Sequence, residues 1–421
     1  MSVRRVRVAG RLSDEALLDD VQRRTFRYFW DFADPGSGMA RDRFGGNDGW
    51  LVSGGSGMGA MAIVTAVTRG WITRAEAVER LHRMLRFLER ADSFHGAFPH
   101  FLTPEGRAIR FGRKDDGADI VETALLMQGL IAARAFFDSG DNSEPWLRGR
   151  IDGLFDAVEW NWFTREGREA YYWHWSPNHG FAMNHEILGW NECLIALVLA
   201  AGSARDPIAP AVYHNGYTQS RTFLNGRQHA VNEHILLPLG PDGGGPLFFA
   251  HYSFLGLDPR GLRDPYADYF AQNEAHVRIN RAYCVRNPKG YAGYGPDCWG
   301  LTASDNHEGY SAHAPDNDLG VIAPTAAIAS LPYAPDLVMP ALHHFHDDLG
   351  DRIYGELGFV DAFNETVGWA AKTHLAIDQG PIVVMIENHR TSLIWDLVMS
   401  DERVRRGLVR LGFTSPHLAT A

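Results

Sequence analysis

The chain has 421 residues, of which 45% are hydrophobic and 12% aromatic, and it carries 40 Lys and Arg against 51 Asp and Glu, a formal net charge of −11. This apolar content excludes an intrinsically disordered chain, and 44 Gly without a period together with three Cys exclude collagen-like and disulfide-scaffold classes. The acidic balance argues against nucleic acid as a partner, and no apolar stretch is long enough for a membrane span, so a soluble protein is predicted.

The N-terminal region shows no export signal. Three Arg in residues 4–7 are followed at residues 13–15 by Ser-Asp-Glu, where a signal peptide needs an apolar run. The sequence therefore predicts a cytoplasmic protein, unless a signal was removed. Cys193, Cys284 and Cys298 are an odd set, so at least one thiol is free or paired with another chain, and the redox compartment stays open.

The first helix is predicted to begin after Ser13, which is placed as an N-cap, because apolar residues between Leu17 and Phe32 recur on one helical face. A long Gly-rich loop over residues 34–56 leads to a small-residue helix over residues 57–68. After a short link, Thr73 and Glu76 form a capping box for a helix that ends near Leu88.

The next elements repeat this alternation of short links and long loops. Asp119 and Glu122 have N-cap and N3 spacing for a helix to residue 135, and Pro145 is placed at the first position of a helix to residue 162. The loop over residues 164–190 is the most aromatic part of the chain, and Asn191 opens another helix.

The second half is less regular. A polar, Gly-rich stretch covers residues 215–246, a helix is predicted over residues 266–284, and a Gly/Tyr loop runs to residue 315. Shorter helices follow around Ala323, Leu337, Val383 and Val404, with a few short strands.

Helical hairpins with short links at one end and long loops at the other predict an all-α (α/α)6 barrel. The short links close one end of the ring, and the long loops build a site at the other. No Pro-, Ser- or charge-rich linker divides the chain, so we expect a single domain over residues 14–412, with tails at residues 1–13 and 413–421.

Three motifs have competing interpretations. Gly57, Gly59 and Ala62 match G-x-G-x-x-A, but no βαβ unit surrounds them, so close helix packing is favoured over dinucleotide binding. Residues 343–348 (HHFHDD) could ligate a metal, yet they match no zinc spacing and are interpreted as a polar helix end. Residues 316–320 offer too few oxygens for an EF-hand, which leaves a solvated turn or a substrate contact. No metal or cofactor is predicted.

Carboxylates interleaved with aromatic residues in the long loops are the main functional signal. Asp115, Asp116 and Asp119 lie in KDDGAD, Glu192 in GWNE and Asp378 in AIDQGP. Glycosidic bonds are cleaved by a carboxylic acid that protonates the leaving oxygen and a second carboxylate that activates water or attacks directly. Flat rings bind the C–H side of a sugar and polar side chains bind its hydroxyls, which makes substrate-binding candidates of Trp50, His95, His100, Trp173, Trp175, Trp190, Tyr291, Tyr294 and Trp299.

Each candidate also has a structural interpretation. The Trp rings could fill the barrel, Asp119 could be only a helix cap, and Asp378 could anchor a loop. Glu192 is placed in the first turn of its helix, where the dipole favours the anion, so a role as acid requires that desolvation beside Trp190 outweigh the dipole.

Seven motifs in order resemble one known family, the glucoamylase-like domain of bacterial endo-β-1,2-glucanases, glycoside hydrolase family 144. The likeness runs from about residue 14 to about residue 412. The motifs are YFWDFADPGSGMAR (28–41), FHGAFPH (94–100), FGRKDDGADIVET (111–123), YWHWSPN (172–178), GWNEC (189–193), NPKGYAGYG (287–295) and CWGLTASD (298–305).

This resemblance implies an (α/α)6 barrel that hydrolyses β-1,2-glucan to short oligosaccharides such as sophorose, with inversion and without a cofactor. It implies Glu192 as general acid, Asp378 on the base side, and Asp115 and Asp119 as an acidic pair around the cleaved sugar. Family members are usually exported, which implies a periplasmic location if a signal was removed. An exo-acting or a retaining, transglycosylating enzyme on the same fold and a non-catalytic glucan-binding barrel remain alternatives, and a monomer or small homo-oligomer is expected.

Overall fold

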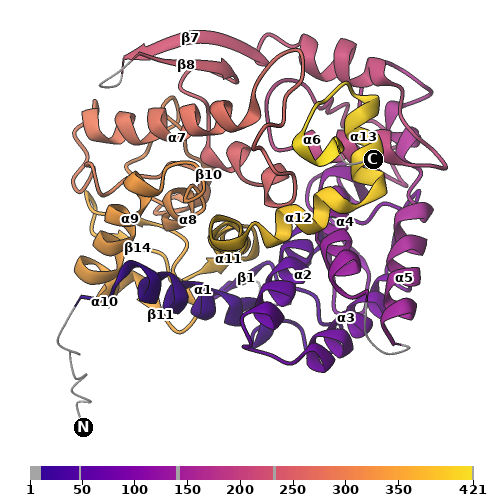
Figure 1. Cartoon of the computed structure of the whole chain (residues 1–421), viewed down its shortest axis with the longest axis horizontal. Coiled ribbons are helices and arrows are strands. Elements are labelled where there is room, and N and C mark those ends of the chain that lie inside the picture. Colours follow the sequence, from indigo (N-terminus) through magenta and orange to yellow (C-terminus); the bar gives the residue numbers. More distant parts are fainter. Residues whose placement is uncertain (1–10, 47–48, 139–142, 231–233, 420–421) are drawn as a thin grey trace.

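The computed structural model describes residues 11–46, 49–138, 143–230 and 234–419 (Figure 1). Its helices are α1 (Asp14–Trp30), α2 (Ser53–Thr68), α3 (Arg74–Leu88), α4 (Ile120–Phe136), α5 (Ser143–Ala157), α6 (Leu194–Gly202), α7 (Tyr269–Arg286), α8 (Pro324–Ile328), α9 (Pro335–His343), α10 (Gly350–Ile353), α11 (Ala376–Thr391), α12 (Leu393–Ser400) and α13 (Glu402–Arg410). No helix in these residues is long and apolar enough to cross a membrane.

The strands form small antiparallel sheets of two or three members. They are β1 (Arg43–Phe44), β2 (Leu51–Val52), β3 (Phe101–Leu102), β4 (Ala108–Ile109), β5 (Ala118–Asp119), β6 (His174–Trp175), β7 (Leu224–Ala230), β8 (His234–Leu239), β9 (Ala303–Asn306), β10 (Gly309–Ala312), β11 (Tyr354–Gly355), β12 (Gly358–Phe359), β13 (Phe363–Asn364), β14 (Trp369–Ala370) and β15 (His374–Leu375).

The helices form an (α/α)6 barrel, as predicted. The inner ring contains α2, α4, α6, the 3₁₀ turns Leu247–Ala250 and Ser253–Leu255, α8 and α11, and outer helices such as α1, α3, α5, α7 and α9 pack against it. In Figure 1 the chain travels around the molecule from α1 through α5 to α7 and α9, and α11 returns to the middle.

Burial explains which helices are inside. Inner helices such as α4 and α6 are buried on nearly all sides, whereas α1 and α3 bury one face and expose charged residues on the other. α2 and α4 approach most closely at two glycines: a Cβ added to Gly129 would lie 1.9 Å from the Gly57 carbonyl oxygen. The packing interpretation of Gly57 is therefore confirmed.

The predicted helix starts are partly right. Ser13 caps α1, and Thr73 and Glu76 form the capping box of α3. α2 begins four residues before Gly57, and Pro145 is the third residue of α5 because that helix begins at Ser143.

The two ends of the described chain are fastened to the barrel. α1 packs against α2 and α11, and Arg390 of α11 bonds Asp19 of α1 at 2.8 Å. Residues 413–419, which the sequence predicts to be a tail, are packed instead: Thr414 exchanges backbone hydrogen bonds with Arg263, and the ring of Phe413 lies against Tyr269.

Because inner and outer helices alternate along the chain, the inner helices run in the same direction and their N-termini lie at one end. Three of them, α2, α4 and α11, follow directly on the short strands β2, β5 and β15. The long loops with the predicted carboxylates therefore gather at this end.

Candidate active site

Asp119 anchors the start of α4. Its Oδ1 accepts hydrogen bonds from the backbone N–H groups of Val121 and Glu122, so the predicted N-cap is confirmed. Its Oδ2 lies 3.1 Å from Nδ1 of His100, which makes it a cap and an ion-pair partner at once. Burial alone would lower the pKa of His100, but the charges of Glu122, Asp119 and Asp115 outweigh it and raise the pKa to about 9. His100 is therefore a cation at neutral pH.

A second histidine, His174, lies near both Asp115 and Asp119. The Nδ1 atom of His174, on β6, is 3.5 Å from Asp115 Oδ1 and 3.9 Å from Asp119 Oδ2. Burial opposes the charged imidazolium, but the two carboxylates raise the pKa of His174 overall. The predicted acidic pair is thus brought together and held by two histidines.

Glu122 is a further member of this cluster that the sequence interpretation treated only as a helix-capping partner. Its Oε2 accepts a 2.7 Å hydrogen bond from the backbone N–H of Gly54 in the first turn of α2, and its Oε1 lies 3.8 Å from Nε2 of His100. Burial and the neighbouring Asp119 charge raise its pKa.

Glu192 lies in a turn two residues before α6, not in the first helical turn that the sequence predicts. Its side chain is half-buried, and the Ser253 hydroxyl donates a hydrogen bond to its backbone carbonyl. Burial, with smaller contributions from the charges of Asp119 and Glu122, raises the pKa of Glu192 to about 7. A carboxyl group with this pKa is partly protonated at neutral pH, as a general acid must be.

Asp378 is the third residue of α11, which begins at Ala376, so the helix starts before the Gly-Pro pair that the sequence suggested. Asp378 is 2% exposed, and its carboxyl lies close to that of Asp361. Burial and the neighbouring Asp361 raise the pKa of Asp378 well above its usual value. Burial and the charge of Asp305 raise the pKa of Asp361 to about 7, although its proximity to Asp378 lowers it.

The carboxyl pair is held by a hydrogen-bond network. The backbone N–H of Asp305, on β9, donates to Asp361 Oδ2 at 2.6 Å, and Arg43 lies 2.9 Å from Asp305 Oδ1. The Thr373 hydroxyl also donates to Asp305. This network fixes Asp361 and, through it, Asp378.

Two tyrosines lie near the acidic groups. The hydroxyl of Tyr252 is buried and has no hydrogen-bond partner among the described residues, and the charges of Asp378, Glu192 and Glu122 add to burial in raising its pKa. Tyr310 is the cross-strand partner of Asp305 in the β9–β10 hairpin and is 47% exposed. Desolvation by the surrounding protein and the charges of Asp378 and Asp361 raise its pKa. Both residues are non-local to the carboxylates, so no sequence motif indicates them.

Four of the predicted aromatic candidates are partly exposed near the first cluster. Trp173 packs on His185 and directly precedes His174 of β6, and Trp175 contacts His95 edge-on. His95 is also bonded to Glu159 and stacked on Trp162. Trp50 packs on Phe101, the neighbour of His100.

The other aromatic candidates have structural contacts. Trp190 and Trp299 are 3% and 0% exposed, so their rings are packed in the interior and expose little surface to a sugar. Trp190 fills the space between Phe254 and Tyr269. Tyr294 donates a 2.6 Å hydrogen bond to Asp318 Oδ1, and Tyr291 donates to the Asp318 backbone carbonyl. The segment 316–320 is therefore a turn tied to these two tyrosines.

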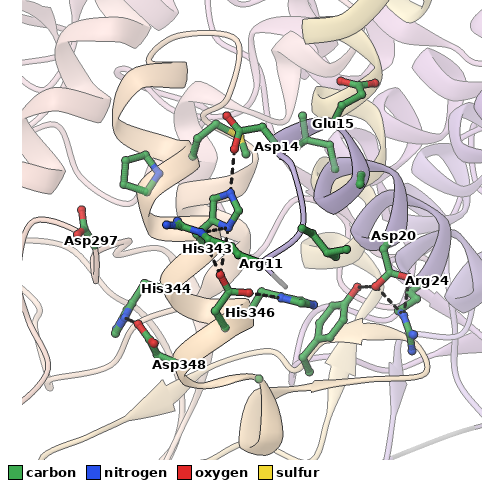
Figure 2. A pocket seen from close by; sticks show the side chains of 18 of the residues that line it. Arg11, Asp14, Glu15, Asp20, Arg24, Asp297, His343, His344, His346 and Asp348 are labelled. Atoms are coloured by element: carbon green, nitrogen blue, oxygen red, sulfur yellow. Dashed lines mark hydrogen bonds and ion pairs between the residues drawn. The ribbon is translucent and has the colours of Figure 1, made fainter. Parts of the chain in front are cut away.

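The His-rich segment 343–348 lies at a different place, beside the start of α1. Figure 2 shows His343 between Asp14 and Arg11 in a cavity of about 2130 Å³. His343 Nε2 lies 2.8 Å from Asp14 Oδ1, and Arg11 donates to His343 Nδ1. His344 pairs with Asp348. No cluster of metal-ligand type is found in the described residues, and the polar-helix-end interpretation fits these pairings.

Comparison with known proteins adds a family. A family model named Glycoamylase, described as "Putative glucoamylase", matches residues 184–402. A curated relative from Parabacteroides distasonis, an exo β-1,2-glucooligosaccharide sophorohydrolase (non-reducing end), is 42% identical over 95% of this chain. The chain spans 58% of the length of that relative.

Two crystal structures match nearly the whole chain. A "putative glucoamylase" from Bacteroides uniformis is 55% identical with a TM-score of 0.95, and an endo-β-1,2-glucanase from Chitinophaga pinensis, in complex with sophorotriose and glucose, is 48% identical with a TM-score of 0.93. Each match covers 97% of this chain and 100% of the other.

Proposed function

The chain belongs to the glycoamylase family, and from this premise we propose that it is a glycoside hydrolase that cleaves β-1,2-linked glucan or its oligosaccharides. The substrate class rests on the relatives, whose names specify β-1,2-glucan and its oligosaccharides. The observation that supports catalysis is the environment of Glu192. This residue is half-buried, lies two residues before an inner helix, and has its pKa raised to about 7. No cofactor enters the proposal.

In this mechanism Glu192 protonates the glycosidic oxygen as the bond to the anomeric carbon breaks. A water molecule attacks that carbon from the opposite face and gives its proton to the Asp361–Asp378 side, which inverts the anomer. Asp378 is 2% exposed, so we propose that it receives the proton indirectly. Asp115 and Asp119 are 5% and 0% exposed, so we propose that they act on the cleaved sugar through the two histidines that they hold.

The direct test is to incubate the protein with linear β-1,2-glucan and with β-1,2-gluco-oligosaccharides and to separate the products. We expect short oligosaccharides such as sophorose, with the α-anomer appearing first in a time-resolved NMR spectrum. Release of one disaccharide size from the outset would indicate exo action, like that named for the Parabacteroides relative, and a mixture of lengths would indicate endo action. A folded protein that releases nothing would contradict the proposal.

The pH dependence of kcat/KM follows from Glu192. Its carboxyl must be protonated to act as acid, so kcat/KM should fall as pH rises through about 7. Without the burial of Glu192 the same decline would occur near pH 4.3, the usual value for Glu. A profile of kcat/KM from pH 4 to 9 measures this limb, and activity that stays constant between pH 6 and 9 would contradict the assignment.

Tyr310 is the exposed group next to the sealed carboxyl pair, so we propose that its hydroxyl takes part in the proton transfer to Asp378. In Tyr310→Phe the ring remains and the hydroxyl is lost. We expect kcat to fall by about 10- to 100-fold with KM within about twofold, because general-base assistance is lost but packing is kept. Tyr294→Phe, which removes a hydroxyl bonded to Asp318, is the matched control. Equal kinetics of Tyr310→Phe and wild type would exclude this role.

A further inference from the structure

Phe111 is an exposed aromatic ring in the same loop as Asp115. It is 57% exposed, and one face stacks on the imidazole of His100 with ring centroids 4.7 Å apart and planes inclined by 20°. Its edge packs against the buried ring of Phe101 at 5.3 Å. Single exposed apolar residues are common on protein surfaces, so the distinctive feature of Phe111 is its stacking on His100.

The loop that carries Phe111 is fixed rather than loose. The backbone N–H groups of Phe111 and Gly112 both donate to the Asp115 carbonyl, and Arg110 donates to the carbonyls of Gly112 and Arg113. Lys114 reaches across to the carbonyl of Ala182. These bonds hold the ring in place before any ligand arrives, which lowers the entropy cost of binding.

The position of the ring relates it to the carboxylates. His100, on which Phe111 stacks, is 3.1 Å from Asp119 and 3.8 Å from Glu122. Phe111 thus places a flat apolar surface over the histidine that the acidic cluster holds. A pyranose needs this pairing, because its C–H face packs on an aromatic ring while its hydroxyls bind carboxylates.

We propose that Phe111 is a sugar-binding platform, on which a glucosyl unit of the substrate next to the cleaved bond stacks against the solvent-facing side of the ring. The proposal rests on the proposed function, since it assigns one binding position within that site. It predicts that Phe111 contributes to binding through its planar shape and not only through its hydrophobicity.

The test is a set of substitutions measured with β-1,2-gluco-oligosaccharides of defined length. Phe111→Ala and Phe111→Leu should both raise KM by about 10-fold with kcat within about twofold, whereas Phe111→Tyr and Phe111→Trp should keep KM near the wild-type value. Leu keeps the apolar cover over His100 and lacks the flat face, so it separates stacking from packing. Trp146→Ala is the matched control, because Trp146 is an exposed ring packed on His82 in the outer helices.

A structural effect on His100 would give a different result. If Phe111 merely supported the imidazole, Phe111→Leu would behave like wild type, and the platform would be excluded. A Phe111→Ala variant with unchanged KM, or with kcat lost and KM unchanged, would exclude it as well. If the wild-type protein neither cleaves nor binds these oligosaccharides, the proposed function itself fails, whereas an active wild type with unaltered Phe111 variants removes only the platform.

Discussion

Glu192→Gln is expected to reduce kcat on β-1,2-glucan by at least about 100-fold. The amide has nearly the shape of the carboxyl but carries no acidic proton, so the leaving oxygen must depart without proton transfer. Because the Glu192 carboxyl is half-buried and feels the charges of Asp119 and Glu122, its neutralisation should not destabilise the fold. The measurement is kcat with the substrate in excess, together with the melting temperature of the variant.

Two observations would accompany this loss if Glu192 is the acid. The decline of kcat/KM above pH 7 should disappear from the residual activity, and substrates with a more acidic leaving group should be affected less. Glu79→Gln, at an exposed position of α3 paired with Arg83, is the matched control and should behave like wild type. Turnover within about threefold of wild type for Glu192→Gln would mean that another group supplies the proton.

Gly129→Ala is expected to destabilise the protein by about 3 kcal/mol or more. The added methyl would lie 1.9 Å from the Gly57 carbonyl oxygen and 2.6 Å from the Gly57 Cα, so α2 and α4 would have to separate. Overpacking in a rigid interior typically costs about 1–3 kcal/mol, and here the obstacle is backbone, which cannot rotate away as a side chain could. Chemical denaturation gives the free energy of unfolding directly.

The control for this substitution lies in an outer helix. Gly149 in α5 has no atom within 4 Å of its added Cβ, so Gly149→Ala should stabilise the protein by up to about 1 kcal/mol through helix propensity alone. Equal effects of the two substitutions would show that the α2–α4 contact is looser than the distances indicate.

Local patterns in the sequence predicted the barrel well, because caps and periodicity are local. Ser13, the Thr73–Glu76 box and Asp119 are N-terminal signals that act within three residues, and all three cap helices as predicted. For Glu122, a prediction from local spacing alone was incomplete. Its spacing from Asp119 suggested a capping role, whereas its carboxylate bonds Gly54 of another helix and lies near His100.

Long-range contacts explain which features of the site could not be predicted from the sequence. Asp361 meets Asp378 only after three short strands have folded between them, and Tyr310 approaches both through its pairing with Asp305. Trp190 and Trp299 have the same local setting as Trp50, so only the packed structure distinguishes a buried ring from an exposed one. The assignment of the substrate-binding rings and of the base side therefore stays a prediction.

The contact between α1 and α11 closes the ring of helices, because α1 belongs to the first helical hairpin and α11 is the last inner helix. A linear stack of helical pairs can unravel from either end, one repeat at a time. Here each pair has a neighbour on both sides, so peeling away the first pair exposes apolar surface on the last as well. The barrel should consequently lose its structure as one cooperative unit, and the acidic groups, which come from hairpins all around the circle, keep their mutual geometry for as long as the circle is intact.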